Sequence, residues 1–249
     1  MLLAGSRPGG DPFAMANGVA LKPLIPVAGE PMLLRPLRAL LACPSITRIR
    51  VLTQDVVGIG AVVDDNLLIT IESSSRTIAS TIASILADPT TTYPILITTA
   101  DHALLTSEMV VKFQDRAAGA DLAIAVVEKG NLMSRLPQSH RTWIGFKGGH
   151  YSGANLFALG SAKAARAISL WASVEQDRKK GWRMLLAFGP ALLLGAVLKL
   201  RTIDQSLAQI GKKLGINLTA IVMDDPLAAV DVDKPSDLAL VEAIIAGTA

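Results

Sequence analysis

Apolar runs alternate with helical patterns along most of this chain, and this alternation restricts the fold more than any other feature. The expected strands are 48–52, 67–71, 94–97 and 122–127, with a short one ending at Ala4. The expected helices are 32–42, 76–86 and 107–117. Repeated strand–helix–strand units of this kind predict an α/β fold with a doubly wound, mostly parallel sheet.

The chain has 249 residues and no long polar or low-complexity tract, which predicts a single domain over 1–249. Hydrophobic residues make up 51% and aromatic residues only 4%, so Ala, Leu, Ile and Val must build the core. After residue 130 the pattern loosens. We expect a loop over 130–140, a small inserted β element over 143–159, and a helical insertion over 161–214.

The first strand ends in Leu3, Ala4, Gly5 and Ser6, followed by a stretch rich in glycine and proline that we expect to be a loop. Small side chains let a ligand lie against the backbone there, and Arg7 and Lys22 add positive charge. The loop therefore suits a polyphosphate. The alternative is a solvated turn with two cations.

Lys22 opens the run Lys-Pro-Leu-Ile-Pro-Val-Ala-Gly-Glu-Pro-Met-Leu, which ends at Leu33. Together with Leu-Ala-Gly-Ser-Arg before it, this run resembles the opening motif of the MobA-like and sugar-phosphate nucleotidyltransferases. That superfamily includes molybdenum-cofactor guanylyltransferases and polyol-phosphate cytidylyltransferases. The resemblance implies a Rossmann-like nucleotidyltransferase fold. It also implies that Arg7 and Lys22 are catalytic and that residues 3–6 bind the nucleotide.

Spacing excludes two other phosphate-binding loops. A Walker loop needs glycine directly before the lysine, whereas Leu21 precedes Lys22. A dinucleotide fingerprint would need a third glycine after Gly58 and Gly60, where Val63 stands instead. A P-loop enzyme and a Rossmann dehydrogenase are both disfavoured.

Three aspartates are candidates for a metal site. Asp101 follows a buried strand, so its carboxylate should emerge at the ligand-binding edge of the sheet and bind Mg²⁺; the alternative, an N-cap, fits Thr106 better. Asp231 and Asp233 lie two apart in an extended run before Pro235. Their segment is similar to the closing D-x-D-x-P-x-D-L motif of the family, which implies that Asp231 completes the Mg²⁺ site. Asp233 either shares that role or caps the last helix.

The segment from Arg76 to Ser80 resembles the R-x-x-S segment of the cytidylyltransferases, in which a serine meets the base and the preceding loop holds the ribose. Here three residues rather than two separate the arginine from the serine. The resemblance implies nucleotide-binding roles for Arg76 and Ser80. The alternative is an ordinary serine-rich helix N-terminus.

Three residues are candidates for binding the second substrate. Gly153 and Asn155 belong to a strand similar to the one that lines the acceptor pocket in this superfamily, although a core strand with a glycine would look the same. His102, beside Asp101, is placed to bind a substrate phosphate, or is a structural histidine.

The implied reaction transfers an NMP group, with CTP favoured, from a nucleoside triphosphate to a phosphorylated alcohol, sugar or polyol. Mg²⁺ is the cofactor and pyrophosphate the product. A GTP-dependent guanylyltransferase of the molybdenum-cofactor or cobinamide-phosphate type is the alternative. A glycosyltransferase is a third hypothesis. Such enzymes have a D-x-D motif after a central strand, whereas this chain has Thr99-Ala100-Asp101 there and lacks the first aspartate.

The net charge of +3 without a dense basic run disfavours nucleic acid as a partner. A lone cysteine, Cys43, and no signal pattern at the N-terminus predict a cytoplasmic protein, and the very short first strand leaves room for a natural start upstream of Met1. In 178–213, cations flank an apolar run. This segment is a buried helix pair, a homodimer contact, or a helix that docks at a membrane or on a membrane-bound partner.

Overall fold

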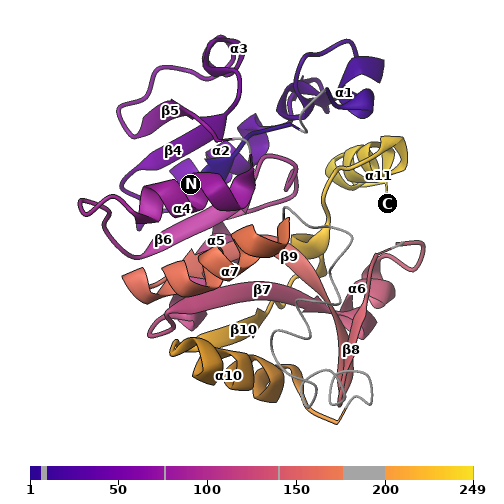
Figure 1. The fold of residues 1–249 in the computed structure, drawn as a ribbon. Coiled ribbons are helices and arrows are strands. Elements are labelled where there is room, and N and C mark those ends of the chain that lie inside the picture. Colours follow the sequence, from indigo (N-terminus) through magenta and orange to yellow (C-terminus); the bar gives the residue numbers. More distant parts are fainter. Residues whose placement is uncertain (7–9, 76, 140, 176–199, 249) are drawn as a thin grey trace. The chain divides into compact units, whose positions relative to one another are not determined.

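The computed structural model describes residues 1–6, 10–75, 77–139, 141–175 and 200–248. The described residues group into two compact units, each built from several stretches of chain (Figure 1). Unit 1 comprises Met1–Arg76, Ile97–Phe113 and Leu227–Ala249. Unit 2 comprises Thr77–Leu96 and Gln114–Pro226.

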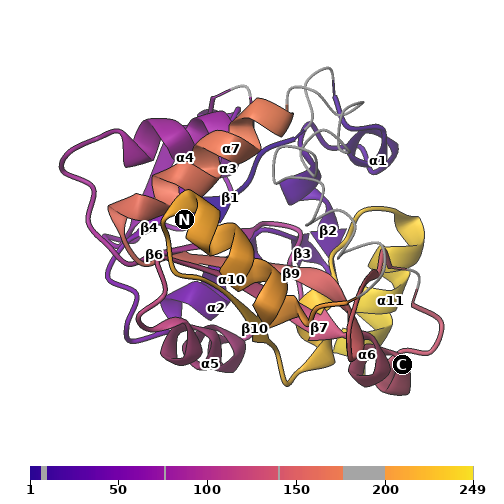
Figure 2. The same cartoon turned by 60° about the horizontal axis from the view of Figure 1, so that its bottom comes forward.

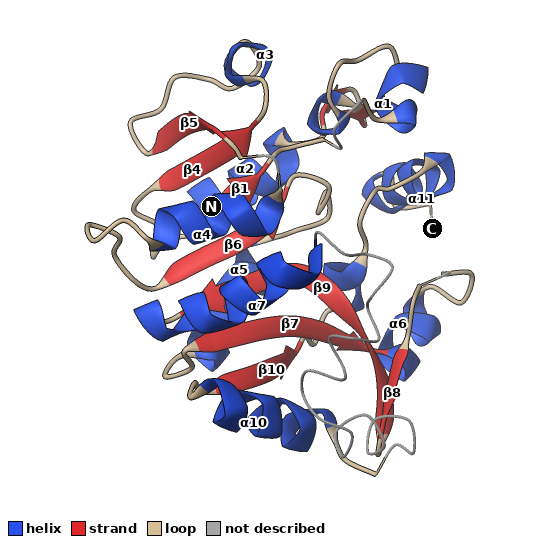
Figure 3. Cartoon of the chain, viewed as in Figure 1, coloured by secondary structure: helices blue, strands red, loops and turns tan. Residues whose placement is uncertain are grey.

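Among the described residues, eight strands form a mostly parallel mixed sheet flanked by helices, as the alternating pattern predicts (Figure 3). Strands β2 (Pro26–Val27) and β3 (Glu30–Pro31) form a separate antiparallel hairpin. The eight strands are β1 (Leu2–Leu3), β4 (Ile49–Thr53), β5 (Ile69–Ser73), β6 (Ile95–Thr99), β7 (Leu122–Glu128), β8 (Ile144–Phe146), β9 (Gly149–Leu159) and β10 (Leu218–Val222).

In unit 1 the short strand β1 pairs in parallel with both β4 and β6, and β4 pairs in parallel with β5. Leu2, Val51 and Ile97 on these strands are buried, which explains why the strands read as continuous apolar runs. Because all four strands run the same way, their carboxyl ends meet at one edge. The loops at that edge begin at Ala4, Gln54, Ser74 and Ala100.

In unit 2 the long strand β9 is antiparallel to β7 and to β8, whereas β10 and β7 are parallel. This confirms the inserted β element. Val126, Ile203 and Ala220 form a buried cluster, against which Phe146 and Tyr151 pack. The pairing of β7 with β9 is irregular between Ile124 and Val126.

The helices of the described residues agree with the expected pattern in most places, and the one expected over 107–117 has those bounds. They are α1 (Pro12–Ala16), α2 (Leu34–Leu41), α3 (Val56–Gly60), α4 (Ile78–Leu86), α5 (Ser107–Ala117), α6 (Lys129–Arg135), α7 (Ala165–Glu175), α10 (Ile203–Leu214) and α11 (Pro235–Ile245), with the 3-10 turns η1 (Lys22–Leu24), η2 (Ala162–Ala164) and η4 (Pro226–Ala229). In unit 2, α4 and α7 lie side by side (Figures 1 and 2).

Two short helices correct the expected loops. In the N-terminal stretch, Asp11 caps α1 by accepting hydrogen bonds from the amides of Phe13 and Ala14, both of which are buried. In the 130–140 stretch, Glu128 caps α6 and Leu132 is fully buried. Helices this short are marginal alone, so the caps and the burial stabilise them.

The 161–214 insertion is helical where the structure describes it. Most of its apolar run, 184–198, and the cations at 178–180 lie outside the described residues, as do Trp182 and Lys199. No helix among the described residues has both the length and the apolarity needed to cross a bilayer. Lys212 and Lys213 lie in the last turn of α10, where positive charge favours the helix dipole.

Candidate active site

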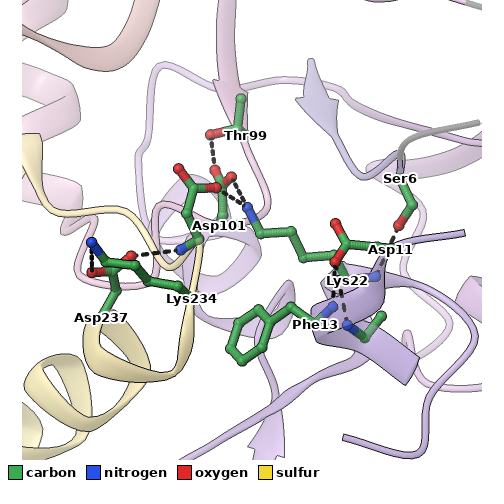
Figure 4. Close-up of polar contacts among 10 residues, drawn as sticks. Ser6, Asp11, Phe13, Lys22, Thr99, Asp101, Lys234 and Asp237 are labelled. Atoms are coloured by element: carbon green, nitrogen blue, oxygen red, sulfur yellow. Dashed lines mark hydrogen bonds and ion pairs between the residues drawn. The ribbon is translucent and has the colours of Figure 1, made fainter. Parts of the chain in front are cut away.

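Two hydrogen bonds of Ser6 hold the loop after β1, one to the backbone of Lys22 and one to the side chain of Gln54. The Ser6 hydroxyl accepts one from the amide of Lys22, at 2.9 Å (Figure 4). The amide of Ser6 donates the other to Oε1 of Gln54, at 2.8 Å. The two halves of the opening motif, far apart along the chain, therefore meet at the carboxyl end of β1.

The ammonium of Lys22 lies between two carboxylates. Its Nζ is 2.7 Å from Oδ2 of Asp101, and it also forms an ion pair with Asp233 (Figure 4). The side chain of Lys22 is 12% exposed and that of Asp101 is 21% exposed, whereas Asp233 is 59% exposed. A cation is thus held at the sheet edge with one half-buried and one exposed acidic partner.

These neighbours keep Lys22 charged. Burial alone would lower the pKa of the ammonium, but attraction to Asp101 and the hydrogen bonds to Asp101 and Asp233 outweigh it, so the pKa of Lys22 is raised above 10.5. A protonated lysine at neutral pH is what binding of a polyanion requires.

Asp101 is held from two sides. The Thr99 hydroxyl donates a 2.5 Å hydrogen bond to Oδ1 of Asp101, and the amide of Val232 donates one of 3.1 Å to the Asp101 carbonyl. The second bond ties the segment from Asp231 to Asp233 to the end of β6. Thr106 accepts a hydrogen bond from the amide of Met109 at the start of α5, so the expectation that Thr106 rather than Asp101 is the cap residue is confirmed.

The donor set suits Mg²⁺. Asp101 and the Asp231–Asp233 segment supply carboxylate oxygens, the ligands this ion prefers, and Mg²⁺ typically takes one or two carboxylates plus phosphate oxygens. Within the described residues, no group of three or more His, Cys, Asp and Glu side chains is arranged to hold a metal on its own. A metal here would therefore depend on substrate phosphates for its remaining ligands.

Of two further residues at this edge, Gln54 was not predicted from the sequence, and Ser74 was included only as part of the loop before Arg76. Gln54, after β4, lies close to Gly5: a Cβ atom added to Gly5 would be 2.8 Å from Nε2 of Gln54. Ser74, after β5, donates its amide to the Thr53 carbonyl, and its buried hydroxyl has no hydrogen-bond partner among the described residues. Their position directly after parallel strands is the signal that could have found them.

Ser80 and His102 have structural contacts. The Ser80 hydroxyl accepts a hydrogen bond from the amide of Thr77, whose own hydroxyl accepts from the amide of Ser80, a reciprocal cap at the start of α4. This contact favours the interpretation that Ser80 belongs to an ordinary serine-rich helix N-terminus. His102 is 1% exposed, and its Nδ1 lies 3.3 Å from the Thr98 hydroxyl, which favours a structural histidine.

The two residues expected to line the acceptor pocket lie in unit 2. Gly153 and Asn155 belong to β9 of unit 2, where Gly153 is exposed and Asn155 has a positive φ of 46° beside the irregular β7 pairing. Irregular pairing of this type re-aims side chains and is frequent near binding sites. Arg7 and Arg76 lie outside the described residues.

Comparison with solved structures identifies the fold of this chain. A transferase from Thermus thermophilus described as hypothetical shares 26% sequence identity, with a TM-score of 0.78 over 95% of this chain and 98% of that one. A 4-diphosphocytidyl-2C-methyl-D-erythritol synthase from Anaerococcus prevotii shares 12%, with a TM-score of 0.58 over 99% and 96%. A CMP:2-keto-3-deoxy-manno-octonic acid synthetase complexed with CTP shares 13%, with a TM-score of 0.59 over 100% and 99%. The fold is that of the α/β nucleotidyltransferases.

A family model narrows this class. Residues 6–214 match the model described as the MobA-like NTP transferase domain. The chain belongs to this family and is a nucleotidyltransferase. No curated protein matches it.

Proposed function

We propose that this enzyme transfers an NMP group from a nucleoside triphosphate, with CTP favoured, to a phosphorylated alcohol, sugar or polyol. The observation that carries the proposal is the Lys22 ammonium, held beside Asp101 at the carboxyl end of the strands and linked through Ser6 to the loop after β1. An enclosed cation next to accessible backbone is suited to a polyphosphate.

In the proposed reaction, an oxygen of the acceptor phosphate attacks the α-phosphorus and forms a new P–O bond. The bond from the α-phosphorus to the oxygen that bridges to the β-phosphate breaks, and pyrophosphate leaves. Such transfers depend on positioning and charge neutralisation rather than on a protein nucleophile. Lys22, with Arg7, would neutralise the triphosphate, and Ser6 would hold the loop in place.

Asp101 and Asp231 would hold Mg²⁺, and Asp233, two residues after Asp231, would share the ion. When bound, the ion would neutralise phosphate charge and bring the two substrates together. The hydrogen bond from Val232 to Asp101 keeps the two aspartate-bearing segments together, whatever the ion contributes.

The choice of CTP rests on relatives of the same fold. The enzyme from Anaerococcus prevotii is a 4-diphosphocytidyl-2C-methyl-D-erythritol synthase, and the other solved structure is a CMP:2-keto-3-deoxy-manno-octonic acid synthetase complexed with CTP. The family model is instead named after MobA, which favours the GTP-dependent guanylyltransferase as the second candidate. In either case, we expect Gln54 and Ser74, directly after β4 and β5, to contact the base or the ribose.

A pyrophosphate-release screen tests the proposal. The four ribonucleoside triphosphates are each combined with phosphorylated sugars, polyols and cofactors, with Mg²⁺ or with EDTA. We expect pyrophosphate release with CTP and one class of phosphorylated alcohol, and only when Mg²⁺ is present. Release with GTP and a cofactor phosphate would replace CTP by the second candidate. Release with no combination would overturn the proposed reaction.

A further inference from the structure

The two carboxylates that Lys22 contacts belong to the same short stretches of chain that would bind a divalent cation. Lys22 Nζ is 2.7 Å from Oδ2 of Asp101 and also forms an ion pair with Asp233. The amide of Val232 binds the Asp101 carbonyl, so these carboxylates are anchored next to each other. An ammonium and a metal ion that use the same oxygens exclude each other.

We propose that the Lys22 ammonium competes with a divalent cation for Asp101 and Asp233, so that the cation binds tightly only when a triphosphate takes Lys22 away from them. This inference rests on the proposed function, because it makes the polyphosphate the partner that relieves the competition. It assigns Lys22 a second role, setting the order in which triphosphate and metal are bound.

Charge and access support this role. Asp101 is mostly buried, so removing its cationic partner leaves a carboxylate that needs another cation. Asp233 is 59% exposed and can change partner without disturbing the core. The backbone of Lys22 is fixed, because its amide donates a 2.9 Å hydrogen bond to the Ser6 hydroxyl. The flexible side chain of the lysine can therefore move its ammonium group while the backbone stays in place.

Mn²⁺ is the probe, because its binding is measured directly by the loss of the free-ion signal in electron paramagnetic resonance. Wild type and Lys22→Met are titrated without nucleotide or acceptor, so the result does not depend on transfer activity. Lys234→Met is the matched control. It removes the same charge next to Asp233, but Lys234 is 55% exposed and pairs with Asp237 instead.

We expect Lys22→Met to bind Mn²⁺ at least about tenfold more tightly than wild type, and Lys234→Met to stay within about twofold of wild type. Lys22→Arg, which keeps the cation, should show no gain. The double variant Lys22→Met with Asp101→Asn should lose the gain. If Lys22→Met binds no more tightly than Lys234→Met, or if the double variant keeps the gain, the competition is refuted.

Thermal unfolding supplies a second measurement that also reports on folding. Mn²⁺ should raise the melting temperature of Lys22→Met by more than it raises that of wild type. Should Lys22→Met not fold, Lys22→Gln offers the same loss of charge with a polar side chain. An equal Mn²⁺ effect on the folded variant and on wild type would count against the proposal. A screen that finds no transfer activity would overturn the proposed reaction and leave this binding result intact.

Discussion

The backbone amide of Val232 donates a 3.1 Å hydrogen bond to the carbonyl of Asp101, and the side chain of Val232 is fully buried. This contact places the C-terminal aspartate motif beside the strand-end aspartate of β6. It also fixes the backbone between Asp231 and Asp233 without using either carboxylate. The two aspartate-bearing segments on the acidic side of the candidate site are therefore joined by a main-chain hydrogen bond that involves none of their carboxylates.

Replacing Lys22 by alanine should remove most of the transfer activity and leave the fold intact. Loss of one charge that clamps a transferring phosphate costs on the order of 3 kcal/mol, or about a hundredfold in rate. Pyrophosphate release at saturating triphosphate measures the effect, and Lys234→Ala is the control. Normal turnover of purified Lys22→Ala would refute the phosphate-loop assignment.

Asp101→Asn and Asp231→Asn should each abolish Mg²⁺-dependent turnover. The double variant should be little worse than either single variant, because residues that act as one unit give non-additive losses. Single-turnover rates for the three variants, compared at equal Mg²⁺, provide the measurement. Losses that multiply would show that the two carboxylates do not share an ion.

Gly5→Ala should weaken nucleotide binding. The added Cβ would lie 2.8 Å from Nε2 and 3.0 Å from Oε1 of Gln54, so the Gln54 side chain must move and its hydrogen bond to the Ser6 amide is lost. Such a bond contributes about 1 kcal/mol, which corresponds to a rise of roughly fivefold in KM for the triphosphate. Gly60→Ala is the control, because its Cβ would meet only Ile71, at 3.8 Å. Equal KM values for the two variants would contradict the prediction.

Ser80→Ala should lower stability without changing nucleotide affinity. The hydroxyl of Ser80 accepts from the Thr77 amide and donates to the Thr77 carbonyl, at 3.1 and 2.9 Å, so its removal weakens the cap of α4. Loss of a cap typically costs about 1 kcal/mol. Denaturant unfolding and the KM for the triphosphate are to be measured together. A large rise in KM with unchanged stability would restore the base-binding role for Ser80.

The ion pair between Arg50 and Glu72 should give a pH-dependent contribution to stability. The hydrogen bond from Arg50 lowers the pKa of Glu72 below 4.5, against the opposing effect of burial. A carboxyl with a lowered pKa stabilises the fold above pH 4.5 and loses that effect as the pH falls through its folded-state pKa. The difference in unfolding free energy between wild type and Glu72→Gln should therefore be largest near neutral pH and shrink below pH 4.5. A difference that stays constant down to pH 3 would argue against this pair.

The sequence alone determined the order of the longer strands and helices, because hydrophobic periodicity is a local property. It placed Gly5 and Asp101 at strand ends, and parallel pairing of β1 with β6 puts those ends at one edge. It did not reveal α1, although Asp11 before Pro12 is a helix-start signal, because a five-residue helix depends on the burial of Phe13 and Ala14.

Tertiary structure decided which side chains meet. Nothing in the spacing indicated that Lys22 would pair with Asp233, or that Gln54 would lie against Gly5. The Lys22–Asp233 pair depends on the burial of Val232, which lies between Asp231 and Asp233 in the sequence. The contact of Gln54 with Gly5 depends on the pairing of β4 with β1. Contacts between segments far apart in the chain depend on packing and register, which a local pattern does not encode.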